Sequence, residues 1–325
     1  MDSDNSKKQE PIWSSAWRRK EWRRFGLVLA LVAVCVIVAA ARPQAMSVDY
    51  VLTLLRQIAI NAILAVGVTY VLLTGGVDLS LGSVVALTGV VAATFAHPGD
   101  YPLVIPLFMG ILAGALCGTV NGLVVTKGRV APFIATLGMM TAARGLAYIF
   151  SGGRPVSRLS SSFIAIGSGS FLGIPIPVWL LAIVAIASAI FLRHTRQGRN
   201  IYATGGNECA AYASGINVHR AKMLAYTVCG AMAGLAGIIQ AARSTTGQPN
   251  AGLMYELDAI ASVVIGGTSL AGGVGGVGGT ILGALLMGVI TSGLDMLNVP
   301  SYYQQVVKGA IIVGAVMLDR RNANQ

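Results

Sequence analysis

Long apolar runs recur along almost the whole chain, and they restrict its fold more than any other feature of the sequence. Only 11% of the 325 residues are charged, whereas a soluble domain has about 25%. A helix of ~20 apolar residues is long enough to cross a bilayer. The alternating segments of ~10 residues that mark an outer-membrane barrel are absent from the sequence. The sequence therefore predicts an all-α polytopic membrane protein.

The apolar runs predict about ten transmembrane helices. Their expected spans are 26–41, 51–73, 79–96, 102–126, 130–150, 174–192, 221–243, 256–270, 279–296 and 304–318. The run at 256–270 is short and is interrupted by glycine. These spans divide the chain into an N-terminal tail (1–25), a transmembrane domain (26–318) and a C-terminal tail (319–325).

Lysine and arginine are distributed unevenly over the two sides that this topology defines. With the N-terminus inside, sixteen basic residues fall on the cytoplasmic side and five on the opposite side, while Arg144 and Lys308 fall inside spans. Basic residues are enriched in cytoplasmic loops, so we expect both termini to be cytoplasmic. The net charge of +11 then belongs to helix ends rather than to a nucleic-acid-binding patch, and no nucleic-acid partner is expected.

The first apolar run has two interpretations. The basic WRRKEWRRFG, the apolar LVLALVAVCVIVAAA and the small-residue ARPQA resemble the three regions of a signal peptide. A retained first helix with its basic end in the cytoplasm has the same pattern. We favour the retained helix, because everything downstream is also embedded in the membrane.

Catalytic and metal-binding patterns are missing from the sequence. The four cysteines show no C-x-x-C spacing, and we expect them to be packing residues. No lysine is followed by Ser or Thr, so the phosphate-binding loop G-x-x-x-x-G-K-[ST] does not occur. His97, His194 and His219 are isolated. The sequence therefore predicts a protein that is not an enzyme and that holds no cofactor or metal.

Segment 193–220 is the largest predicted cytoplasmic loop, and it is patterned rather than random. Within it, NECAAYASGI predicts a short helix, with Asn207 as N-cap, Glu208 in the first turn and Gly215 as the residue that stops it. The apolar side of such a helix could lie on the lipid surface or dock into a groove on a soluble partner. The pattern alone leaves both alternatives open.

The sequence GRNIYATGGNECAAYASGINV resembles the cytoplasmic coupling loop of the ribose-type ABC-transporter permeases. Further segments resemble that family in the same order: TGGVDLSLGSVVALTG, NGLVVTKGRVAPFIATLGMM, YELDAIASVVIGGTSLAGG and SYYQQVVKGAIIV. The resemblance covers about residues 50–318, and several long motifs together are more specific than any one of them.

This resemblance implies the membrane subunit of a bacterial sugar importer in the inner membrane, with ribose as the first candidate among monosaccharides. Two copies would form the path through the lipid. A cytoplasmic ATPase would supply ATP hydrolysis and bind the 198–216 loop, and a periplasmic binding protein would deliver the sugar. The resemblance assigns the coupling role to Gly198, Arg199, Tyr202, Gly205, Gly206, Asn207, Glu208, Ala211 and Gly215.

Two other kinds of transporter remain as alternatives. One is an ABC permease for another small polar solute, such as a branched-chain amino acid. The other is an ion-coupled secondary transporter, which would need no partner. Secondary transporters tend to bury ionisable residues at the middle of the membrane, and this chain has few of them.

Polar residues in or beside the spans are candidates for the translocation path or its gate, although such residues also serve helix packing. They are Gln57, Asn61, Asp78, Asn121, Thr141, Arg144, Tyr255, Glu256 and Asp258. In TGGVDLSLGS (74–83) we expect Asp78 to be first a helix N-cap and second part of an inner gate. Arg144 would either pair with Asp78 or extend toward the outer interface.

The segment IGGTSLAGG (265–273) is similar to TGGVDLSLGS (74–83), since each has a Gly-Gly pair followed by a short polar and apolar sequence. This similarity would record an internal duplication, which is common in transporters. It would equally arise because two glycine-rich helix breaks have the same composition.

Overall fold

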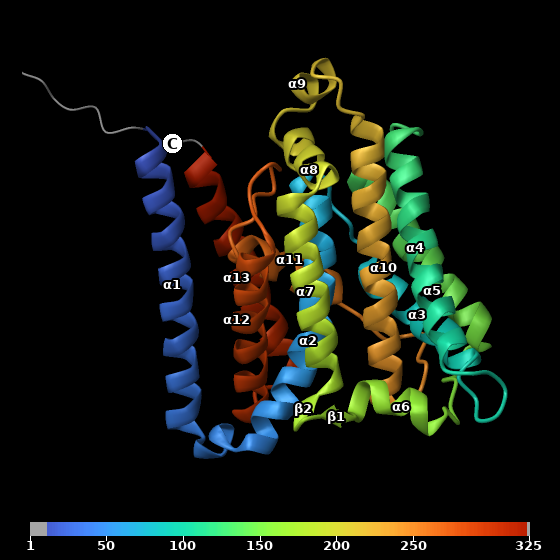
Figure 1. Ribbon diagram of the computed structural model, residues 1–325. Helices are drawn as coiled ribbons and strands as arrows, with labels where there is room; N and C mark the ends of the chain where they lie inside the picture. Colours follow the sequence, from blue (N-terminus) through green and yellow to red (C-terminus); the bar gives the residue numbers. More distant parts are fainter. Residues whose placement is uncertain (1–11, 324–325) are drawn as a thin grey trace, which may run out of the picture.

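Residues 12–323 are described in the computed structural model, in which long helices run between the two ends of one bundle (Figure 1). The first half contains α1 (Ile12–Ala41), the 3-10 helix η1 (Pro43–Met46), α2 (Val48–Leu73), α3 (Leu81–Thr94), α4 (Val104–Thr126), α5 (Pro132–Ser151) and α6 (Ser161–Ser168). The second half contains α7 (Ile176–His194), α8 (Arg196–Gly206), α9 (Glu208–Ala213), α10 (Val218–Ser244), α11 (Tyr255–Ile265), α12 (Val277–Met296) and α13 (Ser301–Ala323). Between the halves, β1 (Ser170–Phe171) pairs with β2 (Ile174–Pro175) in an antiparallel hairpin.

Among the described residues, six helices are long and apolar enough to cross a membrane: α2, α4, α5, α7, α10 and α12. Apolar segments of α1 (25–41) and α3 are shorter. Helix α11, at the expected span 256–270, has 11 residues and is followed by Gly266 and Gly267. The chain is thus a helical membrane protein in which glycine-rich connections shorten some of the expected spans. Helix α1 begins at Ile12, inside the expected N-terminal tail, and residues 1–11 lie outside the described range.

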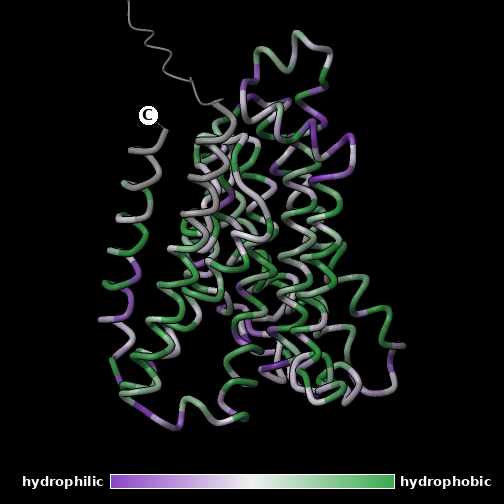
Figure 2. The backbone as a smooth tube through the Cα atoms, turned by 60° about the vertical axis from the view of Figure 1, so that its left-hand side comes forward, coloured by the Kyte–Doolittle hydropathy of each residue, from purple (hydrophilic) through white to green (hydrophobic). Residues whose placement is uncertain are grey.

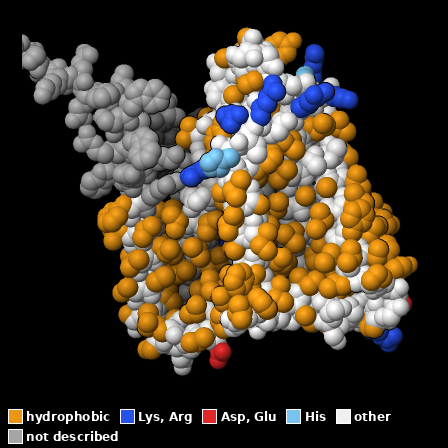
Figure 3. Space-filling view, in the orientation of Figure 1, with side chains coloured by type: hydrophobic (Ala, Val, Ile, Leu, Met, Phe, Trp, Pro, Cys, Tyr) orange, Lys and Arg blue, Asp and Glu red, His pale blue; other side chains and the backbone are white. Residues whose placement is uncertain are grey.

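The two ends of the bundle differ in chemistry. The start of α1 and the end of α13 lie at the same end as α8 and α9, which we call the α9 end, whereas η1 and α6 lie at the opposite end (Figure 1). Hydrophobic positions dominate the helices between the ends (Figure 2). Lysine and arginine side chains gather at the α9 end of the face shown in Figure 3, where Arg193, Arg196, Arg199 and Arg220 are exposed.

Helix α10 is at the centre of the bundle and packs against α2, α3 and α4. Its crossing with α4 depends on glycine, because a methyl group on Gly118 would overlap the carbonyl oxygen of Tyr226, and one on Gly230 would overlap that of Gly114. Small residues let membrane helices approach closely, and packing then stabilises the pair. Cys117 and Cys229 are buried, as expected of packing residues, whereas Cys35 and Cys209 are exposed.

Candidate functional site

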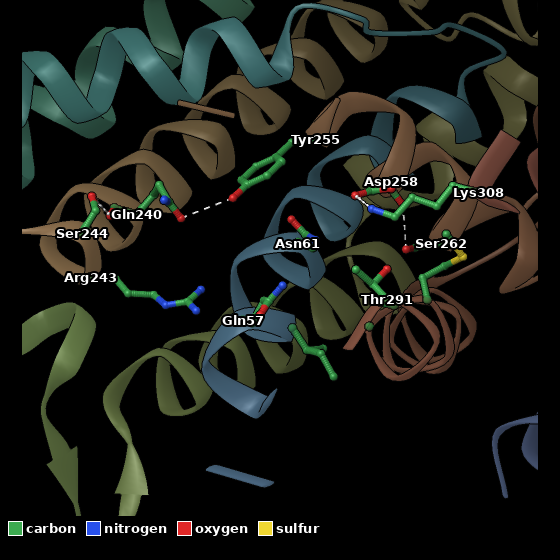
Figure 4. Close-up of a pocket in the computed structure, with 14 residues that line it drawn as sticks. Gln57, Asn61, Gln240, Arg243, Ser244, Tyr255, Asp258, Ser262, Thr291 and Lys308 are labelled. Atoms are coloured by element: carbon green, nitrogen blue, oxygen red, sulfur yellow. Dashed lines mark hydrogen bonds and ion pairs between the residues drawn. The ribbon is translucent and has the colours of Figure 1, made fainter. Parts of the chain in front are cut away.

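A polar cavity of about 440 Å³ lies between α2, α10, α11, α12 and α13 (Figure 4). Sites for small molecules usually have roughly 300–1,000 Å³. The polar residues that line the cavity are Gln57 and Asn61 of α2, Gln240, Arg243 and Ser244 of α10, Tyr255, Asp258 and Ser262 of α11, Thr291 of α12 and Lys308 of α13. Because Arg243 is in the last turn of α10 and Tyr255 begins α11, part of the cavity lies toward the end opposite α9.

The charges on α11 and α13 in this cavity neutralise one another. The Lys308 Nζ atom lies 2.8 Å from the Asp258 Oδ2 atom, and the two side chains are 20% and 13% exposed. The Ser262 hydroxyl donates to the backbone oxygen of Asp258 at 2.7 Å, and the Tyr255 hydroxyl donates to Gln240 Oε1 at 3.5 Å. The remaining polar groups of the lining are amides, hydroxyls and Arg243 (Figure 4), and Ile58, Ala284 and Met287 add apolar surface. The cavity can therefore bind a polar molecule through hydrogen bonds, and Arg243 adds a positive charge to its surface.

Four of the residues expected along the path line this cavity: Gln57, Asn61, Tyr255 and Asp258. The polar face of α10 was not expected there. The sequence did contain an indication of this face: Gln240, Arg243 and Ser244 are spaced at i, i+3 and i+4 and therefore share one side of a helix. Lys308 was also missed, although a lone cation inside an apolar run is a functional candidate in itself.

Asp78 lies outside this cavity, in the connection between α2 and α3, and is 1% exposed. Its Oδ1 atom accepts hydrogen bonds from the Ser80 backbone nitrogen at 2.9 Å and the Ser80 hydroxyl at 2.6 Å. Helix α3 begins at Leu81, with Ser80 before it. The prediction that Asp78 is the N-cap is therefore wrong, because the helix starts later than expected and the carboxylate closes a turn ahead of it. Asn121 also lies outside the cavity, and its Nδ2 atom donates to the Ser80 hydroxyl oxygen at 3.0 Å.

The remaining path candidates are also outside the cavity. Arg144 does not pair with Asp78: its Nη1 atom donates to the backbone oxygens of Pro249 and Ala251, at 2.7 and 2.8 Å. It thus satisfies carbonyl groups of the connection between α10 and α11. Thr141 is exposed on α5, and its hydroxyl donates to a backbone oxygen of its own helix. Glu256 is half-buried in the first turn of α11.

The predicted coupling loop forms two short helices at the α9 end. The Asn207 Oδ1 atom accepts from the Ala210 backbone nitrogen at 3.0 Å, and Gly215 follows α9 with φ +79°, so the predicted cap and stop are both confirmed. Glu208 Oε2 lies 2.7 Å from Lys222 Nζ, which ties α9 to α10. Ala211 is buried. The rest of α9 projects beyond the bundle (Figure 1).

Helix α8 carries the other coupling candidates. Arg199 is exposed, whereas Gly198 is buried. Gly198 packs so closely against the last turn of α7 that a methyl group on it would overlap the Leu192 carbonyl oxygen. The Tyr202 hydroxyl donates to the backbone oxygen of Gly275 at 3.1 Å. Burial raises the pKa of Tyr202, so this phenol remains a protonated donor. Gly205 contacts the last residue of α2, Leu73.

Residues 50–316 match the family described as the branched-chain amino acid transport system / permease component. The chain belongs to this family. The permease is 46% identical over 298 residues to the ribose import permease protein RbsC of Escherichia coli, covering 90% of this chain and 92% of that protein. It is 45% identical over 295 residues to that of Haemophilus influenzae (90% and 91%), and 44% identical over 303 residues to that of Bacillus subtilis (93% and 94%). No solved structure matches the permease.

These relatives confirm the resemblance to ribose-type ABC permeases, and the relatives themselves are named as permeases rather than as enzymes. With its apolar helices, the permease is a multi-pass protein of the inner membrane.

Proposed function

We propose that the permease is the membrane subunit of an ATP-driven importer that carries ribose, or a closely related monosaccharide, into the cell. The observation that carries this proposal is the identity of 44–46% to three ribose import permeases, each over at least 90% of the chain. More distant relatives carry the names of transporters for other sugars, such as D-allose at 36% identity. Identity is thus higher to the ribose permeases than to a permease for a hexose.

The cavity supports a sugar as its occupant. A monosaccharide presents many hydroxyl groups and no charge, so it needs several hydrogen-bond donors and acceptors. Gln57, Asn61 and Tyr255 supply such groups, and the ion pair between Asp258 and Lys308 leaves those two residues neutral overall. We assign these residues to the path. Four other candidates, namely Asp78, Asn121, Arg144 and Glu256, are assigned to the packing of the helices and connections around it. Thr141, which is exposed on α5, is assigned to neither role.

We propose ten membrane crossings with both termini in the cytoplasm, as the charge distribution predicts. The arrangement supports this topology, because the start of α1 and the end of α13 lie at the α9 end (Figure 1), where basic side chains gather (Figure 3). Short helices α3 and α11 would complete their crossings with the extended segments beside them. Residues 26–318 then form one transmembrane domain, with 193–220 on its cytoplasmic face.

Three partners follow from this function. A cytoplasmic ATPase would dock on the projecting α9, with Arg199, Tyr212 and Glu208 among the exposed groups around the contact. A second copy of the permease would complete the path through the membrane. A periplasmic binding protein would deliver the sugar to the end opposite α9, toward which the cavity extends.

Reconstitution in proteoliposomes tests the proposal. The permease, a candidate ATPase and a ribose-binding protein are combined, and uptake of labelled ribose is measured with and without ATP. We expect uptake that depends on all three proteins and on ATP, that falls with Gln57→Ala and Asn61→Ala, and that leucine does not inhibit. Uptake driven by an ion gradient without the ATPase would contradict the proposal, and inhibition by leucine would redirect it to amino acids.

A further inference from the structure

Three segments that contain glycine meet at the α9 end of the bundle. They are the end of α2 with Gly75, the end of α8 with Gly205, and the connection 266–276 between α11 and α12. The Gly273 backbone nitrogen donates to the Leu73 carbonyl oxygen at 3.0 Å, and the Tyr202 hydroxyl donates to the Gly275 carbonyl oxygen at 3.1 Å. We call these three segments the glycine junction.

In the glycine junction, backbone packs directly against backbone. A methyl group on Gly205 would overlap the Leu73 carbonyl oxygen and lie 2.6 Å from the Gly273 nitrogen. One on Gly272 would lie 2.8 Å from the Gly205 oxygen and 2.9 Å from the Gly75 nitrogen. Closely packed interiors are nearly incompressible and transmit strain. Here no flexible side chain intervenes at these contacts, so a displacement of one segment must displace the others.

The junction is connected on one side to the proposed docking element. Helices α8 and α9 are separated by Asn207 alone. Its backbone nitrogen donates to Ala203 of α8 at 3.1 Å, and its side chain accepts from Ala210 of α9 at 3.0 Å. This residue is therefore bonded to both helices. Any movement imposed on α9 reaches the end of α8, and with it Gly205.

On its other side the junction is connected to the cavity. Helix α2 ends in the junction at Leu73, α11 leads into the 266–276 connection, and α12 follows from it. These three helices are also walls of the polar cavity, where they carry Gln57, Asp258 and Thr291. The glycine junction is therefore in contact with three of the five helices that enclose the proposed path.

We propose that the glycine junction transmits a displacement of α9 to α2, α11 and α12, with Gly205 as the positioning residue. This inference rests on the proposed function, because a docked ATPase supplies the displacement. It separates two tasks within the coupling loop: α9 contacts the partner, while Gly205, which faces Leu73, connects that contact to the path. Alanine at position 205 would then leave docking intact and uncouple it from transport.

The test compares Gly205→Ala with Gly278→Ala in the complete reconstituted importer. Gly278 lies in the first turn of α12, next to the same connection, and a methyl group there meets no atom within 4 Å. For Gly205→Ala we expect ATPase binding within about twofold of wild type and ribose uptake per ATP lowered about tenfold, since overpacking of this size displaces backbone. For Gly278→Ala we expect neither value to change.

A conformational measurement separates uncoupling from a merely structural defect. Thr291→Cys places a thiol in the cavity in a background that lacks the native cysteines, and its labelling rate is followed with and without ATP. We expect ATP to change this rate in the permease that carries only Thr291→Cys, and also when Gly278→Ala is added. We expect no change with ATP when Gly205→Ala is added. Tyr202→Phe removes only the hydroxyl that donates to the Gly275 carbonyl oxygen, and it should reduce the ATP-dependent change in labelling rate severalfold. If Gly205→Ala does not fold, Tyr202→Phe alone tests whether the glycine junction carries the coupling.

Two results would overturn the inference. Uptake and ATP-dependent labelling that are the same in Gly205→Ala, Tyr202→Phe and Gly278→Ala would show that the glycine junction carries no coupling. A wild-type permease that binds no ATPase would overturn the proposed function, and this role of the junction with it. The first result leaves the proposed function standing, so the two failures are distinguishable.

Discussion

The Lys308 ammonium lies 2.8 Å from the Asp258 carboxylate and joins α13 to α11 across the polar cavity. The two side chains are 20% and 13% exposed, so both charges have lost most of their contact with solvent. An unpaired charge in such a place is costly. The ion pair therefore holds two walls of the cavity together and also keeps their contribution to its surface neutral.

Removal of one partner of this pair should destabilise the permease. Asp258→Asn leaves the Lys308 ammonium without its counter-ion, and we expect a loss of about 1–3 kcal/mol, less than the ~3–5 kcal/mol of a fully buried pair because this one is partly exposed. The double variant Asp258→Asn with Lys308→Gln should recover much of the loss. Thermal unfolding in lipid nanodiscs measures both. Additive losses in the double variant would show that the two residues do not interact.

The ion pair between Glu208 and Lys222 should behave differently. It is equally short, at 2.7 Å, but the Glu208 side chain is 56% exposed. Exposed pairs contribute about 0–1 kcal/mol and are screened by salt. We expect Lys222→Gln to lower the free energy of unfolding by less than about 1 kcal/mol, with a smaller effect in high salt. A larger loss, independent of salt, would mean that Lys222 has a further structural role.

The crossing of α4 and α10 should be intolerant of any added side chain. Gly118→Ala places a methyl group on the Tyr226 carbonyl oxygen. The helices must then separate, and we expect a destabilisation of about 1–3 kcal/mol or more. Gly138→Ala on α5 is the matched control, because a methyl group there meets no atom within 4 Å. Equal melting temperatures for the two variants would contradict the close approach of these helices.

Asp78 should be required for its oxygen atoms rather than for its charge. Asp78→Asn keeps an acceptor for the Ser80 nitrogen and hydroxyl, so we expect folding and transport close to wild type. Asp78→Ala leaves these buried groups without that acceptor, at a cost of about 1–3 kcal/mol. Yield after detergent extraction and ribose uptake measure the difference. Loss of transport in a well-folded Asp78→Asn would instead assign the charge to the gate.

Local chemistry made some features of the permease predictable from its sequence. Asn207 caps α9 and Gly215 follows it as expected, because a cap involves residues only a few positions apart. The apolar runs located the long helices because an apolar run is likewise a property of residues that are close together in the sequence. The start of α3 was misplaced by two residues, however, and this error was enough to assign Asp78 the wrong role.

Contacts between distant segments were not predictable. Arg144 bonds to carbonyl groups more than 100 residues away, and Lys308 pairs with Asp258 on a different helix. The spacing of polar residues along a helix shows which of them share a face, but it does not show which other helix that face meets. For the same reason Gly205 was predicted to belong to a coupling loop, while its contact with Leu73 was not predicted.

The topology should be visible in the reactivity of the cysteines. Cys209 is exposed on α9, whereas Cys117 and Cys229 are buried and Cys35 lies in the apolar part of α1. A membrane-impermeant maleimide should therefore label Cys209 in inside-out vesicles and not in intact spheroplasts, because α9 faces the cytoplasm in the proposed topology. Cys209→Ser should abolish this labelling and serves as the control. Labelling of Cys209 from the periplasmic side would show that every helix in the bundle has the orientation opposite to the one proposed. The basic residues of the α9 end would then lie on the side that the positive-inside rule disfavours.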